Sequence, residues 1–366
     1  MSLRVLHVIP SLVGGGAERQ LVALSGALTA AGVDVHLAYL HGGPNLEPAR
    51  QSGATLHPLV VGNNHDPRVI WSLRQLIRRT KPVAVQTWLL HADVFGGLAA
   101  RWCRVPWLLA ERSSQAMYGQ GQKFRLRRWL GRSADLIVAN SQGGQDYWRA
   151  AGFAGPSVVI RNIVAKPHRT DPGSTDVAPL AAPHIVAVGR LSEEKNFALL
   201  LDALALLFKH CPDARASILG DGPQREALAA QIARSSLLVD RVALPGHVDD
   251  VAQRLSSATL CVSLSRFEGT PNTVIEAVNQ GCPLVLSDIP AHREWLSGDE
   301  ARWVSLNNPE PIAAAMQDML RAPTAAREKL TLARARLQAW SADRIAAQYI
   351  SAYEQLINRE ALCASS

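Results

Sequence analysis

The sequence is poor in cysteine and has no hydrophobic run long enough to span a membrane. Its five cysteines are scattered over 366 residues, odd in number and without a CxxC pair, which argues against a disulfide scaffold or a zinc site. The longest apolar stretches, such as LLLDALALLF, are interrupted and shorter than a bilayer requires. The opening MSLRVLHVIP leads straight into a strand pattern without signal-peptide architecture. These absences predict a protein of the reducing cytoplasm.

Acidic residues are absent from two stretches, 67–92 and 112–134. The formal net charge is +7, and both stretches mix arginine and lysine with apolar residues that include Trp71 and Trp129. No helix-turn-helix, zinc or RNP-like motif accompanies the charge, so we expect no nucleic-acid partner. The stretches predict either contact with an anionic membrane or acceptor, or ordinary solvated helix faces. The candidate residues for such a contact are Arg112, Lys123, Arg125, Arg127, Arg128 and Ser141.

Apolar runs alternate with helical patterns along most of the chain, which is typical of a doubly wound parallel sheet. We expect strands at 4–9, 34–40, 83–88, 107–111, 135–140 and 157–162, and again at 184–190, 216–222, 241–246, 259–265 and 282–288. A segment rich in Pro, Asp, Ser and Thr at 165–183 separates the two series as a linker. The sequence therefore predicts an α/β protein with two Rossmann-like domains, 1–170 and 171–340, followed by an amphipathic helix at 341–361.

Unusual polar and glycine residues gather where the predicted strands end. Ligands of parallel sheets bind beyond the carboxyl ends of the strands, so this edge of each sheet is the expected ligand site. In the first half these residues are Gly14, Gly15, Gly16, His41, His91, Glu111, Arg112, Asn140 and Ser141. In the second half they are Gly189, Arg190, Gly220, Gly222, Gly246, His247, Glu268 and Asp288.

The glycine run in VIPSLVGGGAERQ lacks the features of a dinucleotide-binding loop. Arg19 stands where a third glycine of that fingerprint is needed, and the second strand ends LAYLHG without an acid. The run, with Gly15 and Gly16, still allows the backbone to approach an anionic ligand closely. The alternative is a plain tight turn.

Arg190 and Lys195 lie between a strand and a helix in VAVGRLSEEKNFALLLDAL. A cation near a helix N-terminus opposes the helix dipole, so its presence there needs another reason. Two cations at this place suit a pyrophosphate, with Arg190 able to bind two oxygens at once. The alternative is a surface ion pair of Lys195 with Glu193 and Glu194.

The stretch SRFEGTPNTVIEAVNQGCPLV, residues 265–285, frames a helix start with two acids. Thr270 and Pro271 predict that the helix begins at Pro271, and Gly281 with Pro283 ends it. The backbone N–H groups of Asn272 and Thr273 would hold a phosphate. A carboxylate accepts hydrogen bonds from a sugar diol, so Glu276 would bind a ribose and Glu268 a second sugar. The stretch therefore predicts a sugar-nucleotide site.

The same stretch resembles the E-x7-E motif of retaining glycosyltransferases of family 4, which have the GT-B fold. The fuller family pattern is met by Glu268, Gly269, Pro271, Glu276, Ala277, Gly281 and Pro283. GGGAERQL, GRLSEEKNFALLLDAL, LGDGPQREAL and LPGHVDDV are similar to further family segments in the same order, so the resemblance covers nearly the whole chain. Thr270 departs from the aromatic or aliphatic residue of many members, which leaves the identity of the sugar open.

The resemblance implies two Rossmann-like domains that face each other across a cleft. The domain 1–170 would bind the acceptor, with the helix 341–361 packing back on it, and the domain 171–340 would bind the nucleotide sugar. Arg190 and Lys195 would neutralise the diphosphate leaving group, Glu276 would bind the ribose and Glu268 the transferred sugar. His91, which by itself fits an ordinary histidine at a helix start, would line the sugar pocket. The remaining donor-binding residues implied are Gly15, Gly16, Gly189, Gly220, Val248, Gly269, Thr270, Pro271, Asn272 and Thr273.

The expected reaction moves a sugar, with retention, from a nucleoside-diphosphate sugar to an acceptor hydroxyl. A UDP-sugar is favoured by its frequency in the family, with GDP-mannose as the alternative, and the expected acceptor is a lipid-linked glycan of bacterial surface polysaccharide at the inner face of the plasma membrane. No D-x-D metal motif occurs near the predicted site, so we expect neither a metal nor another cofactor. The alternatives are a nucleotide-sugar epimerase, which would need no acceptor, and a non-catalytic sugar-nucleotide-binding protein. A phosphorylase would need a pyridoxal phosphate lysine that the second half does not offer.

Overall fold

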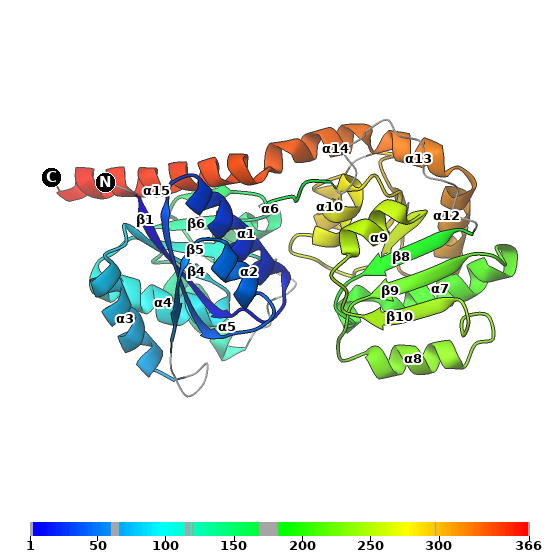
Figure 1. Cartoon of the computed structure of the whole chain (residues 1–366), viewed down its shortest axis with the longest axis horizontal. Coiled ribbons are helices and arrows are strands. Elements are labelled where there is room, and N and C mark those ends of the chain that lie inside the picture. The colour runs from blue at the N-terminus through cyan, green and yellow to red at the C-terminus, as the bar shows by residue number, and fades with distance from the viewer. Residues whose placement is uncertain are drawn as a thin grey trace. The chain divides into compact units, whose positions relative to one another are not determined.

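The chain forms two compact units, each with its own sheet and core (Figure 1). The computed structural model describes residues 3–59, 66–113, 118, 121–167, 182–296 and 298–364. Unit 1 comprises Met1–Ile163 and Trp340–Ser366, and unit 2 comprises Val164–Ala339. The units therefore divide at 163/164 and 339/340, where the sequence predicted 170/171 and 340/341. Most of the expected linker, 165–183, lies outside the described residues.

Unit 1 contains a parallel sheet of seven described strands in the order β3-β2-β1-β4-β5-β6-β7. Its strands are β1 (Arg4–Ser11), β2 (Asp34–His41), β3 (Thr55–Pro58), β4 (Ala84–Trp88), β5 (Trp107–Glu111), β6 (Leu136–Ala139) and β7 (Ser157–Val159). Its helices are α1 (Gly16–Ala30), α2 (Leu46–Gln51), α3 (Arg68–Thr80), α4 (Leu90–Cys103), α5 (Gln122–Gly131), α6 (Gln142–Ala150) and α15 (Ala342–Ala364). All the strands predicted for the first half are confirmed, whereas β3 was not predicted.

Both faces of this sheet are covered. One core contains side chains of α1 and α15, such as Leu24 and Tyr353, packed on the sheet, and the other contains side chains of α3 and α6, such as Leu73 and Trp148. Central strands buried on both faces read as nearly continuous apolar runs, which is why they could be recognised in the sequence. The C-terminal helix α15 lies beside α1 in unit 1 (Figure 1).

Unit 2 contains a parallel sheet of six described strands in the order β10-β9-β8-β11-β12-β13. Its strands are β8 (His184–Val188), β9 (Arg215–Leu219), β10 (Val242–Gly246), β11 (Leu260–Ser263), β12 (Leu284–Ser287) and β13 (Arg302–Val304). Its helices are α7 (Phe197–His210), α8 (Arg225–Ala233), α9 (Val251–Ser257), α10 (Asn272–Asn279), α11 (Pro290–Arg293), α12 (Pro309–Arg321), α13 (Pro323–Lys329) and α14 (Thr331–Leu337), with 3₁₀ turns at Glu193–Lys195 and Gln338–Trp340. The five strands predicted here are confirmed, and β13 was missed.

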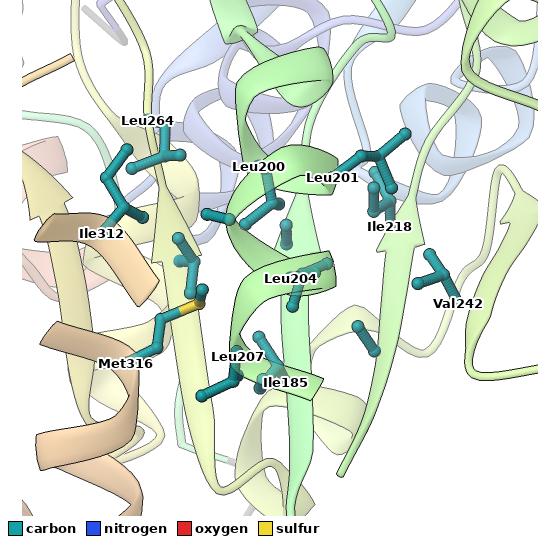
Figure 2. Packing of buried hydrophobic residues seen from close by; sticks show 14 of the residues in the cluster. Ile185, Leu200, Leu201, Leu204, Leu207, Ile218, Val242, Leu264, Ile312 and Met316 are labelled. Carbon is teal, nitrogen blue, oxygen red and sulfur yellow. The ribbon is translucent and has the colours of Figure 1, made fainter. Parts of the chain in front are cut away.

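The core of unit 2 lies between its sheet and the helices α7 and α12. Figure 2 shows Leu204 and Leu207 of α7 next to Ile185 of β8, while Met316 of α12 points toward the same core. This packing fixes β8, the central strand of the sheet, on which the site described below depends.

Each sheet reverses its strand order at one place. In unit 1 the order turns at β1, which pairs with β2 on one side and β4 on the other. In unit 2 it turns at β8, which pairs with β9 and β11. Connections leave such neighbouring strands in opposite directions, which opens a crevice at their carboxyl ends. The places to look for ligand-binding residues are therefore the ends of β1 and β4, and of β8 and β11.

Candidate functional site

The two predicted cations follow β8. Arg190 is exposed just beyond the strand, and Lys195 lies in the 3₁₀ turn Glu193–Lys195 that precedes α7. The Lys195 side chain is 20% exposed and its Nζ lies 2.5 Å from Oε1 of Glu268, whose side chain is 12% exposed. The surface pair with Glu193 and Glu194 is thus not the arrangement found, and Glu194 instead accepts a hydrogen bond from Ser192 Oγ at 2.5 Å.

Glu268 follows β11, the neighbour of β8 across the strand-order reversal. Its Oε1 accepts a second hydrogen bond, of 2.7 Å, from the hydroxyl of Ser265. Residues 73 positions apart in sequence, Lys195 and Glu268, therefore meet at the carboxyl edge of the sheet. A diphosphate bound at this edge would lie between one exposed guanidinium and one partly buried ammonium.

The helix that starts between the two acids begins one residue later than predicted. α10 begins at Asn272, and Pro271 precedes it with φ −78° and ψ 72°, outside the helical region. The Asn272 amide bonds to the Thr270 carbonyl at 2.9 Å, a tight turn that displaces the helix start by one residue. Phosphate binding by the Asn272 amide would have to replace this bond.

One further bond ties α10 to β8, and two more close the C-terminal end of the helix. Thr273 Oγ1 donates to the carbonyl of Val188, the last residue of β8, at 3.3 Å, so the first turn of the helix is tied to the strand that carries Arg190. Glu276 lies one turn further on and is partly buried. The predicted helix end is confirmed: Gly281 adopts φ +68°, and the amides of Gly281 and Cys282 bond to the carbonyls of Val278 and Ala277 in a Schellman motif.

The ends of β8 and β9 approach so closely that only glycine fits. Gly220 has φ +133°, and a Cβ there would overlap the carbonyl oxygen of Gly189. The amide of Gly189 bonds to Leu219, and that of Gly220 to Gly246 at the end of β10. Val248 lies two residues beyond Gly246 and is partly exposed. This edge of unit 2 is therefore formed largely by backbone, which suits close contact with a flat or anionic ligand.

Unit 1 presents its predicted residues at the corresponding edge of its own sheet. Gly15 is the N-cap of α1, with extended backbone at φ −146°, and Gly16 is the first residue of that helix. His91 lies in the first turn of α4, directly after β4. The residue before α4, Leu89, has φ +71°, a strained conformation for a branched side chain that is found most often at functional sites.

Arg127 was predicted to contact a membrane or an acceptor, and this prediction is wrong. Its side chain is only 1% exposed and forms ion pairs with Asp93 at 2.7 Å and Glu111 at 2.9 Å. Glu111 also accepts hydrogen bonds from Tyr118 and Trp148, and burial raises the pKa of Asp93 to about 6. The sequence contained a signal for this: Arg127 lies three residues before the buried Leu130, on the inward stripe of α5.

Two other candidates for acceptor contact have structural bonds. Ser141 is buried, and its hydroxyl accepts a hydrogen bond from the Gly144 amide as the N-cap of α6. Arg112 stacks on the Trp88 ring at 4.1 Å and donates to Asn162 Oδ1 and to the Tyr349 hydroxyl of α15. Lys123 and Arg125 are exposed on α5, as predicted, and Arg128 is partly exposed.

Within the described ranges, no three His, Cys, Asp or Glu side chains gather in a way that could hold a metal ion. In the same part of the chain, no helix combines the length and the apolarity that a bilayer crossing requires.

Two family models match the chain, one in each unit. The model of glycosyltransferase family 4 matches residues 14–165, and the model of glycosyl transferases group 1 matches residues 182–322. The two Rossmann-like units and these matches define the class as a glycosyltransferase with the GT-B fold. Together the matches cover more than half of the chain, which belongs to the family 4 glycosyltransferases.

Similar proteins agree with this assignment. A lipopolysaccharide core biosynthesis glycosyltransferase, LpsE of Rhizobium meliloti, is 26% identical over 321 residues, which cover 84% of this chain and 86% of LpsE. A glycogen synthase of Mycobacterium tuberculosis is 27% identical over 387 residues, covering 92% of this chain and 90% of that protein. Among solved structures, Anabaena HepE in complex with UDP and glucose has a TM-score of 0.83 at 20% identity and covers 96% of this chain and 100% of its own. At that identity HepE shows the fold alone.

Proposed function

We propose that this glycosyltransferase moves a sugar, with retention of configuration, from a nucleoside-diphosphate sugar to an acceptor hydroxyl. The observation that carries the proposal is the ion pair of Lys195 with Glu268 where the strand order of unit 2 reverses. A bond also ties the first turn of α10 to β8, the strand that leads to Arg190. A donor of this kind has an anionic diphosphate between two sugars. The residues at this edge of unit 2 offer charges that suit such a donor: two cations, Arg190 and Lys195, and two carboxylates, Glu268 and Glu276.

The residues have separate tasks in this proposal. Arg190 and Lys195 stabilise the charge that develops on the departing diphosphate, the largest single contribution expected from such a site. Glu276 accepts hydrogen bonds from the ribose, and Glu268 from hydroxyls of the transferred sugar. Because Glu268 is engaged in this way, it is not the nucleophile of a double displacement. We propose a front-face transfer in which the departing phosphate takes the proton of the acceptor hydroxyl.

The remaining donor contacts are proposed from the family resemblance. In unit 2 they come from the segments around Gly189, Gly220, Val248 and Gly269 to Thr273, and in unit 1 from Gly15, Gly16 and His91. Neither a metal nor an organic cofactor takes part in this proposal. Turnover should therefore survive chelation by EDTA.

A UDP-sugar is the favoured donor, with a GDP-sugar as the alternative. Support for uridine comes from HepE, whose structures contain UDP, UDP with glucose, or UDP-glucose. Support for guanosine comes from GDP-mannose-dependent mannosyltransferases of Mycobacterium tuberculosis, which are 31% identical over 156 residues. The similarity to LpsE, named for lipopolysaccharide core biosynthesis, supports a bacterial surface glycan as the product.

We also propose that unit 1 docks on an anionic cytoplasmic membrane surface, where it meets a lipid-linked acceptor. The helices α3, α4 and α5 are packed side by side, and their outer surface exposes Trp71, Trp102 and Trp129 to 50%, 55% and 67%. Arg74 lies 4.8 Å from the Trp71 ring and 4.5 Å from the Trp102 ring. Exposed tryptophans next to arginines suit the interface between lipid headgroups and acyl chains.

The donor site is tested by binding. UDP, GDP, ADP and their sugars are compared by thermal shift on the purified chain, and the best nucleotide is measured by calorimetry. Glu276→Ala should weaken its binding by about 1.5–3 kcal/mol, the range for a hydrogen bond to a charged group. Glu193→Ala, an exposed acid of the same unit, should bind as the wild type does. Equal affinity of the wild type and Glu276→Ala would remove Glu276 from the site.

A further inference from the structure

A lysine and a serine both donate hydrogen bonds to the carboxylate of Glu268. Lys195 Nζ and Ser265 Oγ both lie within hydrogen-bond distance of Oε1, at 2.5 Å and 2.7 Å. The lysine is a cation on a long flexible chain, whereas the serine hydroxyl belongs to a short side chain that is 1% exposed. The two donors should therefore respond differently when a ligand enters.

Ser265 is itself fixed from the interior of unit 2. Its carbonyl accepts a hydrogen bond of 2.6 Å from Ser287 Oγ at the end of β12. The Ser287 carbonyl in turn accepts a bond of 2.8 Å from Nδ1 of His292 in α11. Because a carbonyl cannot donate, Nδ1 carries the hydrogen. His292 is fully buried, and burial lowers its pKa, so the ring remains neutral in this role. The serine thus belongs to a chain of bonds that joins β11, β12 and α11.

A donor diphosphate competes with Glu268 for Lys195. It carries more negative charge than one carboxylate, and Arg190 is exposed nearby to bind it at the same time. When Lys195 turns to the phosphates, Glu268 loses its cation at the moment when it has to accept bonds from the sugar. The Ser265 hydroxyl does not depend on the phosphates and keeps its place.

We propose that Ser265 is a positioning residue that keeps the Glu268 carboxylate directed at the transferred sugar after the diphosphate has drawn Lys195 away. The inference rests on the proposed function, because it takes Glu268 as the acceptor of sugar hydroxyls. In this arrangement Lys195 leaves the Glu268 carboxylate when it binds the diphosphate. Ser265 then prevents that carboxylate from moving.

Ser265→Ala isolates this role. The substitution removes only the hydroxyl and leaves the backbone carbonyl that Ser287 bonds, so the chain through His292 stays in place. Ser263→Ala is the control from the same segment: it removes a hydroxyl that forms a long hydrogen bond of 3.4 Å with that of Ser265, and it leaves the Ser265 hydroxyl in place. Thermal melting of both variants verifies that unit 2 is intact.

The probes are UDP, which lacks the transferred sugar, and UDP-glucose, which carries one. By calorimetry, Ser265→Ala should raise the Kd of UDP-glucose about tenfold, as expected for one hydrogen bond to a charged group, and should leave the Kd of UDP within about twofold. In the background of Glu268→Ala the same substitution should have no further effect, because its action passes through that carboxylate. An additive effect in the double variant, equal weakening of both probes, or wild-type behaviour of Ser265→Ala would overturn the proposal.

A readout without ligand separates this inference from the proposed function. If the wild-type chain bound neither probe, the proposed uridine donor would be wrong, and Ser265 would be tested by the ¹⁵N side-chain signal of Lys195. An ammonium held in a fixed ion pair exchanges its protons slowly enough to be seen. The signal should be sharp in the wild type and in Ser263→Ala and lost in Ser265→Ala. Identical signals in all three proteins would show that Ser265 does not position Glu268.

Discussion

His7 lies in the middle of β1 and has no exposed surface, so a charge on its ring would not be solvated. Its Nδ1 accepts a hydrogen bond of 3.1 Å from Trp88 Nε1, so the hydrogen of the neutral ring is on Nε2, which has no partner among the described residues. Burial, assisted by the charge of Arg112, lowers the pKa of His7 to about 3. The ring of His7 is therefore neutral in the folded chain over a range of pH in which it is protonated in the unfolded chain.

This difference predicts a loss of stability in mild acid. The pKa of His7 in the folded chain lies below the unfolded value of 6.5. The contribution of the neutral ring to the free energy of unfolding is therefore complete above pH 6.5 and is lost as the pH falls toward 3. The slope for one proton is at most about 1.4 kcal/mol per pH unit, so the step from pH 6.5 to pH 5 should cost up to about 2 kcal/mol. His7→Asn retains an acceptor for Trp88 and cannot titrate, and urea unfolding should show a smaller loss between pH 7 and pH 5 than in the wild type. His247→Asn, at an exposed histidine, is the control, and a wild-type pH dependence in His7→Asn would contradict the assignment.

At the scale of single residues, the charged residues of the proposed donor site could be predicted from the sequence, but their ion-pair partners could not. Arg190, Lys195 and Glu268 stand out because each follows an apolar strand, and strand ends meet at one edge of a parallel sheet. The pairing of Lys195 with Glu268 depends on β8 and β11 being neighbours, which the order of strands along the chain does not state. Proximity in the sequence offered Glu193 and Glu194 as partners of Lys195, which was the alternative interpretation, whereas the tertiary fold pairs Lys195 with Glu268.

The basic helix α5 shows how one element divides its charges between two environments. Arg125 and Arg127 are two residues apart, yet the first is exposed and the second lies between Asp93 and Glu111 in the interior. Successive residues of a helix point about 100° apart, so two positions along the chain separate opposite faces. Counting charges in a stretch therefore does not measure the charge of a surface.

The two arginines make a matched pair of substitutions. Arg127→Ala should destabilise unit 1 by about 3–5 kcal/mol, because it leaves two acids buried without their cation. Arg125→Ala should change the stability by less than about 0.5 kcal/mol, as is usual for an exposed side chain. Urea unfolding followed by tryptophan fluorescence measures both. Equal small effects would mean that the acids find other partners or take up protons at little cost.

The elements that the sequence did not predict are short or lie at the edge of a sheet. The strands β3 and β13 are edge strands of four and three residues, and such strands have too few apolar positions to give a recognisable pattern. The helix α10 was predicted with its end correct and its start one residue early. Glycine at a left-handed position marks an end clearly, whereas the exact start depended on a bond between Thr270 and Asn272.

At the scale of the whole chain, the helix α15 belongs to the same unit as the first strands. After unit 2, residues from Trp340 onward belong to unit 1, and α15 supplies Ile345, Tyr349 and Tyr353 to its core. The Tyr353 hydroxyl donates to Gln86 of β4 at 2.5 Å, and Tyr349 contacts Arg112. An amphipathic final helix was visible in the sequence, but its place in the first unit was expected only from the family resemblance.

The proposed membrane docking would involve a whole face of unit 1, and the structure changes which residues should carry it. Arg127 is excluded, whereas Trp102 of α4, absent from the predicted stretches, joins Trp71 and Trp129 on the exposed surface of α3, α4 and α5. Each cation near an anionic bilayer contributes about 1 kcal/mol, so several acting together would hold the chain reversibly at moderate salt. The tryptophans would add apolar burial at the interface, which salt does not weaken.

Liposome co-sedimentation tests this surface. Binding should rise with the phosphatidylglycerol content of the liposomes, fall with added salt, and drop when Lys123, Arg125 and Arg128 are changed together to Ser. A triple variant of unit 2 with Lys209, Arg234 and Arg321 changed to Ser loses the same charge from exposed positions, and it should bind as the wild type does. Trp71→Ser with Trp102→Ser should weaken the binding that remains at high salt, because that part depends on burial and not on charge. If neutral and anionic liposomes sedimented equal, small amounts of the chain, the basic surface would be a solvated one and a soluble acceptor the better hypothesis.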